Sequence, residues 1–254
     1  MYLQLMTQGR EFPKLQSNSV LLCNGEITLL VDGGGFERIP ILEQNLLKQG
    51  FSLDQIDLLL FTHLHIDHLT DVSLFKNAQI ALHWKEWELL EKWLKTPEHA
   101  LEKVIKSEYD IIHPIYILLF IRSINSFRTQ LQPLLKNKAR CLFLEEGYHF
   151  APNIKVIATH GHTSGHISVC IGIENRFIWI TGDAILSLSN WLSRYEPITG
   201  LCSNIKLQQE TLKYFEDKKG LIVPGHGQPF DIESLQTVIL EDYLLGNIGY
   251  LNKI

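Results

Sequence analysis

The sequence has few of the features that mark disulfide-rich, membrane-spanning or nucleic-acid-binding proteins. Its four cysteines lie far apart and form no Cys-x-x-Cys pair, so we expect reduced thiols rather than a disulfide framework or a zinc knuckle. No apolar run approaches the roughly 20 residues that a membrane-spanning helix needs. The N-terminus also lacks the basic segment and apolar core of a signal peptide. These absences predict a cytoplasmic protein without a transmembrane segment.

The charge argues against a nucleic-acid-binding protein. The net charge is −5 and no long run of Lys and Arg occurs, so the sequence has no strong electrostatic footprint for nucleic acid. With 254 residues, 45% of them hydrophobic and 20% charged, the composition is that of an ordinary globular protein with a sizeable core. We therefore expect one domain that covers residues 1–254.

One stretch is rich in groups that bind metal ions. In His63-x-His65-x-Asp67-His68, three imidazoles and a carboxylate fall within six residues, directly after the apolar run 58–61. A polar, solvated loop is the alternative, but four ligand-capable groups in six positions are hard to place that way. Imidazole nitrogen and carboxylate oxygen suit zinc and also accept iron or manganese. The stretch therefore predicts a metal site at the end of a buried strand.

This stretch resembles the signature of the metallo-β-lactamase superfamily, in its glyoxalase II and lactonase-like branch. The remaining parts of the family pattern follow in order: His162 in the segment 159–166, Asp183 after Thr181-Gly182, and His226 after Pro224-Gly225. The resemblance covers about residues 18 to 230. Several motifs in the right order are more specific than any one of them alone.

The resemblance implies a dinuclear site. His63, His65 and His162 would hold one metal, Asp67, His68 and His226 the other, and Asp183 would bridge both, with two zinc ions as the expected cofactors. It implies a metal-dependent hydrolase that uses a metal-bridging hydroxide on a carboxyl ester, lactone or thioester of a small molecule. Asp67 is also the expected catalytic residue. Asp32 and His166 are expected to support the ligands from behind.

The hydrophobic pattern predicts alternating strands and helices. We expect strands over residues 18–23 and 26–32 joined at Asn24-Gly25, then over 57–62, 78–83, 153–159, 167–173, 176–181 and 221–223. Helices are expected over 39–49, from near 85, over 205–215, and from Asp231 to about 245. The glycines at 33–35 predict a tight turn near the site rather than a phosphate loop. The resemblance sharpens this pattern to an α/β fold, the four-layer αββα sandwich.

Residues 95–140 interrupt the family pattern with helix-like sequence. We expect a helical insert that covers the pocket and could also join two copies into a homodimer. A buried helix is an alternative. A membrane-surface helix is a weaker one, because the segment lacks the basic polar face that such helices carry.

The substrate is less well defined by the sequence. Asp183 argues against a true β-lactamase, the segment after His226 is too short for a thioesterase's helical domain, and Leu186 stands where lactonases of the superfamily have a tyrosine. Trp191 or Tyr195 could replace that tyrosine. The alternatives are a phosphodiesterase or ribonuclease, a mononuclear iron dioxygenase of the persulfide type, and a non-catalytic binding module.

Overall fold

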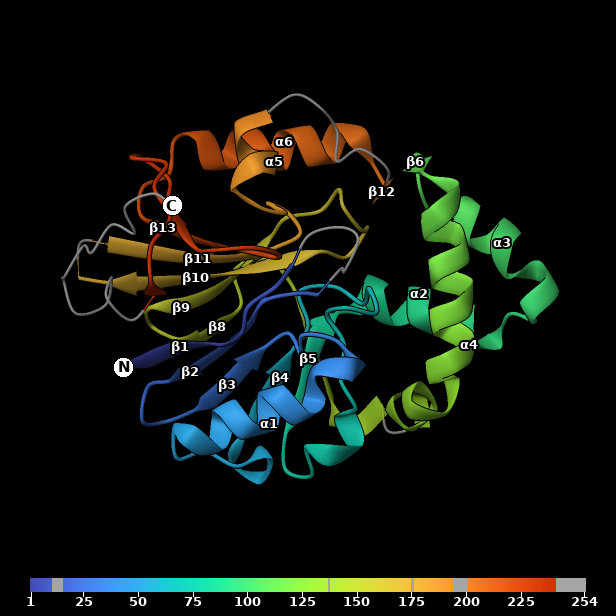
Figure 1. The fold of residues 1–254 in the computed structure, drawn as a ribbon, viewed down its shortest axis with the longest axis horizontal. Helices are drawn as coiled ribbons and strands as arrows, with labels where there is room; N and C mark the ends of the chain where they lie inside the picture. The colour runs from blue at the N-terminus through green and yellow to red at the C-terminus, as the bar shows by residue number, and fades with distance from the viewer. Residues whose placement is uncertain (11–15, 137, 175, 194–200, 241–254) are drawn as a thin grey trace.

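Two six-stranded sheets form the centre of the molecule (Figure 1). The structure, a computed structural model, describes residues 1–10, 16–136, 138–174, 176–193 and 201–240. The first sheet has the order β1-β2-β3-β4-β5-β7 and the second the order β14-β13-β11-β10-β9-β8. The first comprises β1 (Tyr2–Thr7), β2 (Ser19–Cys23), β3 (Thr28–Val31), β4 (Leu58–Leu60), β5 (Gln79–His83) and β7 (Cys141–Leu144). The second comprises β8 (His149–Ala151), β9 (Ile154–Ala158), β10 (Ile167–Ile173), β11 (Arg176–Gly182), β13 (Leu221–Pro224) and β14 (Phe230–Asp231).

The alternation of side chains along the strands builds a core between the sheets. Val20 and Leu22 of β2 and Val156 of β9 belong to one buried cluster that joins the two inner faces. Successive residues on a strand point to opposite faces, so Leu21 and Cys170 fall into the clusters of the outer faces instead. Both faces of each sheet are therefore covered by apolar side chains.

Helices cover the two outer faces (Figure 1). Leu42 and Leu46 of α1 (Ile39–Lys48) are buried in the same cluster as Leu21 of the first sheet. Phe215 of α6 (Ile205–Glu216) lies in the cluster of the second sheet, beside α5 (Leu188–Ser193). The layers run helix, sheet, sheet, helix, which confirms the predicted αββα sandwich. Short 3₁₀ turns occur at Phe36–Arg38, Leu53–Gln55, Val72–Leu74 and Lys138–Arg140.

The helical insert packs against the helix that precedes it, and its apolar side chains join the buried cluster on the outer face of the first sheet. It contains α3 (Glu98–Lys106), β6 (Ile111–Ile112) and α4 (Pro114–Lys136), and it follows α2 (Trp84–Lys95). The Arg128 guanidinium of α4 donates to the carbonyl oxygens of Leu94 and Thr96, at the end of α2. β6 pairs with β12 (Leu201–Cys202), so the insert is also joined to the segment before α6.

The predicted helix does not begin at Asp231, because residues 231–239 form a strand end, a turn and a bridge, and helical structure first occurs at Leu240. Asp231 ends β14, and its Oδ1 accepts hydrogen bonds from the backbone N–H groups of Glu233 and Ser234. The same Asp side chain that can cap a helix here closes a turn, after which Thr237 bridges back to Phe230. The rest of that prediction, residues 241–254, lies outside the described residues.

Two other expectations concern cysteines and membrane spans. All four cysteines are free thiols, as expected. In the described part of the chain, no helix is both long enough and apolar enough to cross a membrane.

Candidate metal centre

Loops that follow four strands meet at one edge of the two sheets. The loop after β4 carries residues 63–68, and the loop after β9 carries His162. Asp183 directly follows β11, and His226 lies two residues beyond β13. β11 and β13 are parallel neighbours with Gly182 opposite Pro224, so their carboxyl ends bring Asp183 and His226 together.

Three histidines and one carboxylate form a first donor group. His65 Nδ1 is 2.9 Å from both His63 Nε2 and His162 Nε2. Asp183 Oδ2 is 3.3 Å from His162 Nε2 and 4.0 Å from His63 Nε2. All four side chains are buried, and their donor atoms lie within 4.8 Å of one another. The first group is therefore compact enough for one ion.

The second donor group contains Asp67, His68 and His226. Asp67 Oδ2 is 3.4 Å from His226 Nε2 and 3.9 Å from His68 Nε2. The other oxygen of Asp183, Oδ1, is 3.1 Å from His68 Nε2 and 3.3 Å from His226 Nε2. One carboxylate thus presents one oxygen to each group.

Hydrogen bonds behind the second group direct its nitrogen lone pairs inward. His68 Nδ1 is 2.8 Å from Asp32 Oδ2, and His226 Nδ1 is 3.0 Å from the backbone carbonyl oxygen of Arg10. Carboxylate and carbonyl oxygens only accept, so Nδ1 donates in both rings. In the neutral rings Nε2 then carries a lone pair. This is the arrangement by which carboxylates and carbonyls hold metal-binding histidines.

The first group has similar support. Thr62 Oγ1 donates its hydrogen to Asp32 Oδ2 at 2.8 Å, so it accepts from His63 Nδ1 at 3.1 Å. The Tyr109 hydroxyl group is 2.8 Å from His65 Nε2. Both rings therefore have their remote nitrogens engaged, and their other nitrogens face the centre of the group.

The donor set fits divalent cations. His68 Nε2 and Asp183 Oδ1 are buried and lie 3.1 Å apart. Neither atom has a hydrogen-bond partner among the described residues. A lone pair and a carboxylate oxygen at this distance repel each other unless a proton or a cation lies between them. Neutral imidazole and carboxylate are the ligands of zinc and of similar divalent ions.

The two groups differ in how they bind protons. Burial lowers the pKa of His63 and His65 well below the usual value and that of His162 to about 4, so these rings stay neutral. Burial, the largest single influence, also lowers the pKa of His68 and His226, but the negative charges of Asp183 and Asp67, with that of Asp32 beside His68, together outweigh it. The pKa of His68 is raised well above its usual value and that of His226 to about 8.

The two residues expected behind the ligands are both close to them. Asp32 contacts His68 and Thr62 as described, and its backbone has a φ of 57°, which is strained for a residue with a side chain. His166 lies against His63, with ring centroids 5.0 Å apart, and its Nδ1 is 2.9 Å from Thr159 Oγ1. Within the described part of the chain, His166 makes no hydrogen bond to any of the seven donor side chains, so its support is by packing.

Gly225 allows the close approach of Asp183. A Cβ atom at Gly225 would lie 1.8 Å from Asp183 Oδ1. No side chain fits at this position while the carboxylate occupies its place between the two groups. The glycine before His226 is therefore part of the geometry of the shared carboxylate.

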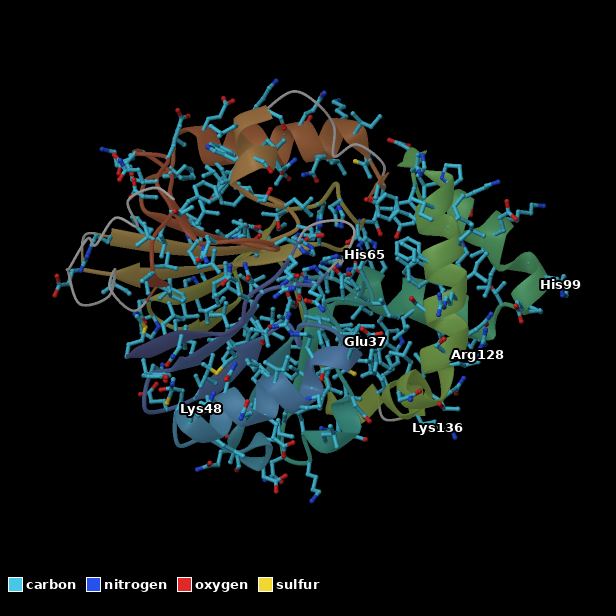
Figure 2. All side chains as sticks on the ribbon, viewed as in Figure 1. Glu37, Lys48, His65, His99, Arg128 and Lys136 are labelled. Atoms are coloured by element: carbon cyan, nitrogen blue, oxygen red, sulfur yellow. The ribbon has the colours of Figure 1, made fainter. Side chains whose placement is uncertain are left out.

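The insert reaches the metal centre. The rings of Phe120 and His65 have centroids 5.0 Å apart, and Trp93 packs against Phe120 at 5.6 Å. Figure 2 shows His65 between the edge of the sheets and α4. Together with the Tyr109 hydrogen bond, these contacts place aromatic side chains from α2 and the insert beside the first group.

Sequence reasoning missed three side chains that hold the site. The Tyr109 hydroxyl group contacts His65, and the Glu86 carboxylate accepts from the backbone N–H of Leu64 in the same loop. Asn18 donates through Nδ2 to the carbonyl oxygens of Pro224 and Gly227, on either side of His226. None of the three lies in a motif, and their role follows only from burial and contacts. The suggestion of Trp191 as a site residue is wrong, because that ring is buried in the core under α6. Tyr195 lies outside the described residues.

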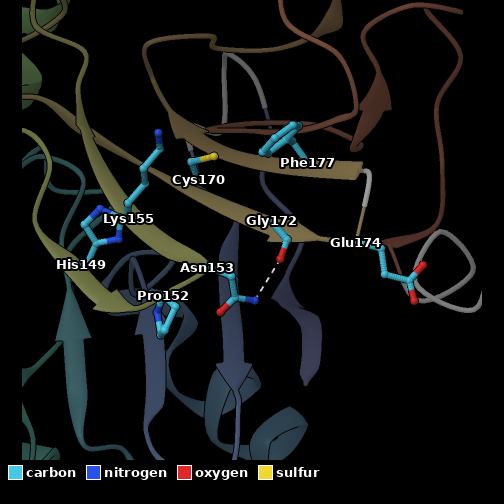
Figure 3. Close-up of a pocket in the computed structure, with 8 residues that line it drawn as sticks. All are labelled: His149, Pro152, Asn153, Lys155, Cys170, Gly172, Glu174 and Phe177. Atoms are coloured by element: carbon cyan, nitrogen blue, oxygen red, sulfur yellow. Dashed lines mark hydrogen bonds between the residues drawn. The ribbon is translucent and has the colours of Figure 1, made fainter.

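A separate hollow of 490 Å³ lies on the outer face of the second sheet (Figure 3). His149, Lys155, Cys170 and Phe177 line it, and Asn153 Nδ2 donates to the carbonyl oxygen of Gly172 at its floor. None of the seven convergent donors lines this hollow. The hollow is therefore separate from the metal centre at the edge of the sheets.

Comparisons with known proteins agree with this arrangement. Residues 12–226 match the family described as Metallo-beta-lactamase superfamily. A Xenopus laevis protein named Metallo-beta-lactamase domain-containing protein 1 is 23% identical over 215 residues, which cover 84% of this chain and 72% of that protein.

Solved structures share the fold. AidC, described as a dizinc quorum-quenching lactonase in complex with a product, is 20% identical with a TM-score of 0.61, over 83% of this chain and 72% of that chain. AbOPH, described as a hydrolase in the beta lactamase superfamily, is 22% identical with a TM-score of 0.63, over 86% of this chain and 75% of that chain.

Proposed function

The chain belongs to the metallo-beta-lactamase superfamily, and from that premise we propose that it is a dinuclear metal-dependent hydrolase of carboxyl esters, lactones or thioesters. The observation that carries the proposal is the position of Asp183. Its two carboxylate oxygens face two different donor groups, at 3.3 Å from His162 Nε2 on one side and 3.1 Å from His68 Nε2 on the other. A single ion would need only one of these groups.

The seven donors divide into the two proposed ligand sets. His63, His65 and His162 would hold one ion, Asp67, His68 and His226 the other, and Asp183 would bind both. All seven donor atoms are imidazole nitrogens or carboxylate oxygens, which suit two zinc ions, with iron or manganese as substitutes. Bound divalent cations would supply Lewis acidity toward water and toward the developing oxyanion.

Asp67 is proposed as the residue that moves a proton. Its side chain is 15% exposed, whereas the side chains of Asp183 and His226 are 5% and 1% exposed. Asp67 therefore lies at the open side of the second group, where water and the leaving group can reach a carboxylate. A general acid or base must be within hydrogen-bond reach of the proton that it transfers.

The insert supplies an apolar and phenolic surface for an organic substrate. Tyr116 and Phe120 are four residues apart on α4 and so lie on one face of the helix. Phe120 packs on His65, and Tyr116 is half-buried. Burial raises the pKa of Tyr116, and the negative charges of Asp67 and Asp183 raise it further, so its phenol stays protonated. We propose that the acyl part of the substrate lies against these rings. The lactonase activity named for AidC adds lactones to the substrates to be tested.

Location and assembly complete the proposal. Free thiols at all four cysteines are typical of a reducing compartment, in keeping with the cytoplasm.

On α4, Ile115, Leu118 and Leu119 are exposed by 38%, 64% and 37%. These apolar side chains support homodimerisation through the insert. The proposal predicts a dimer mass in sedimentation and a monomer for Leu118→Glu, and a monomeric wild type would contradict it.

The test of the activity combines elemental analysis with a substrate panel. Protein purified without added metal is assayed against an ester, a lactone, a thioester and a phosphodiester, before and after chelation and reloading with zinc. Turnover of a carbonyl substrate that is lost on chelation and restored by zinc would support the proposal. Turnover of only the phosphodiester would favour a phosphodiesterase or ribonuclease. A single iron without hydrolysis would favour the persulfide-type dioxygenase.

A further inference from the structure

We propose that Glu86 is a positioning residue that joins the two loops carrying His63, His65 and His162 and so keeps the spacing of the first donor group. The inference rests on the metal centre proposed above and adds a residue outside the seven donors. Glu86 lies in the first turn of α2, and it is 0% exposed.

The two oxygens of Glu86 bind different loops. Oε2 accepts from the backbone N–H of Leu64 at 3.0 Å, between the first two histidines of the metal motif. Oε1 accepts from the Thr163 hydroxyl group at 2.6 Å and from the backbone N–H of Gly165 at 2.9 Å, directly after His162. One planar carboxylate therefore fixes the separation of loops that are about a hundred residues apart in the sequence.

The backbone at Gly165 is shaped for this contact. A Cβ atom there would lie 2.9 Å from both Glu86 Oε1 and the Glu86 backbone nitrogen. Contacts this short do not occur for real side chains, so the loop can approach Glu86 only with glycine at 165. The close approach is an observation independent of the hydrogen bonds.

Helix α2 holds Glu86 in place on its other side. The His83 side chain accepts from the backbone N–H of Lys85 at 3.2 Å and caps the helix. Trp87 and Leu90 are buried in the core of the first sheet. The carboxylate is thus carried by a packed element, and the loops are arranged around it.

The charge distinguishes this role from ordinary core packing. A buried carboxylate is costly unless hydrogen bonds or a cation compensate it. Glu86 has three hydrogen-bond donors and, among the described residues, no ion pair. All three donors belong to the ligand loops. The stabilisation that offsets the buried charge therefore comes from the two segments that place the histidines.

Glu86→Gln tests the proposal with little change in volume. The amide keeps one acceptor oxygen, so its NH₂ group faces the backbone N–H of either Leu64 or Gly165, and the hydrogen bond to that loop is lost. Glu88→Gln is the matched control, because Glu88 lies two residues away on the same helix and is exposed. Zinc affinity is measured by competition with a chromophoric chelator, and amide hydrogen exchange at Leu64 and Gly165 is measured by NMR on the metal-free protein.

We expect Glu86→Gln to weaken zinc binding about 10- to 100-fold, the usual cost of removing a residue that supports metal ligands. Exchange at Leu64 and Gly165 should rise while amides in the central strands stay protected. The control should stay within about twofold of the wild type, as exposed substitutions usually do. Glu86→Asp, which keeps the charge but not the reach, should lie between the two.

An unchanged zinc affinity and unchanged exchange at both amides in folded Glu86→Gln would overturn the proposal. If this variant does not fold, Thr163→Val removes one of the three donors, and unaltered zinc affinity there would count equally against it. If the wild-type protein bound no zinc, the proposed function would be contradicted instead. The exchange data at Leu64 and Gly165 would then still decide whether Glu86 joins the loops.

Discussion

The two halves of the metal centre are built from the same residue types but in different electrostatic settings. The first group, His63, His65 and His162, is buried beside the insert, and burial lowers the pKa of each ring. In the second group the carboxylates raise the pKa of His68 and His226.

This difference has a consequence for metal binding. The first group presents neutral nitrogens to an incoming ion at neutral pH, whereas the second must first release protons from His68 and His226. A metal ion competes with bound protons for the same lone pairs. We therefore expect the first group to bind its ion in a nearly pH-independent way and the second in a strongly pH-dependent way.

Asp183→Ala should have the largest effect, because it removes the one side chain that both groups share. Metal binding and hydrolysis should both fall by more than about 100-fold, beyond the usual cost of altering a supporting residue. Elemental analysis and steady-state kinetics check this, with circular dichroism to show that the fold persists. Full turnover in a variant that has lost its metal would contradict the mechanism.

His65→Ala and His226→Ala should separate the two groups. Each variant removes a donor from one group, so each should keep about one ion in the other while losing hydrolysis. Native mass spectrometry of the two variants measures the number of ions per chain. Loss of both ions in both variants would show that the groups do not fill independently.

Asp32→Asn and Tyr109→Phe test the support behind each group. Asp32 accepts from His68 at 2.8 Å, and the Tyr109 hydroxyl group lies 2.8 Å from His65. Removing such a partner usually costs about 10- to 100-fold in metal affinity. Tyr109→Phe should weaken the first group and spare the second. Asp32→Asn should mainly weaken the second, and calorimetric titration with zinc would reveal a reversed or uniform pattern.

The pH dependence should differ between the single-group variants. The pKa of His226 is raised to about 8 in the metal-free protein, so its proton is bound at pH 7 and is lost as the pH rises through about 8. In His65→Ala, zinc affinity should therefore rise by about one log unit per pH unit for each proton released, and the part that comes from His226 should end at about pH 8. In His226→Ala, which keeps the neutral first group, it should stay nearly flat above pH 7. Calorimetry in buffers of different ionisation enthalpy counts the released protons.

If zinc affinity depended on pH equally strongly in both variants, the proposed difference between the two groups would be contradicted. That result would mean that the first group also carries protons at neutral pH. The free energy of unfolding of the metal-free protein gives a second check. The stability from the raised pKa of His226 should be present below about pH 6.5 and lost as the pH rises through about 8.

The strands and the metal-binding stretch His63-x-His65-x-Asp67-His68 could be predicted because their information is local. The four-layer order and the three donors further along the chain, His162, Asp183 and His226, could be expected only through the resemblance to the superfamily, because periodicity alone does not give them. Glu86 and Asn18 could not be predicted in the same way. Their partners lie far along the chain, and an isolated Glu or Asn has no pattern that shows it to be buried.

The two wrong expectations have a similar cause. Asp231 is a good helix cap in sequence, but here it ends β14, which pairs with β13, and a turn follows, so helical structure first occurs at Leu240. Trp191 lies close in sequence to Asp183, yet its large ring is taken up by the core between the second sheet and α6. In both cases tertiary packing decided between local alternatives that the sequence left equal.

The number of divalent ions bound per chain by the wild-type protein tests the central claim most directly. Native mass spectrometry across a zinc titration at pH 8, with hydrolysis of the best carbonyl substrate followed in parallel, gives both quantities. The shared position of Asp183 predicts two ions per chain and activity that rises with the second ion. Saturation at one ion with full activity would contradict the dinuclear account.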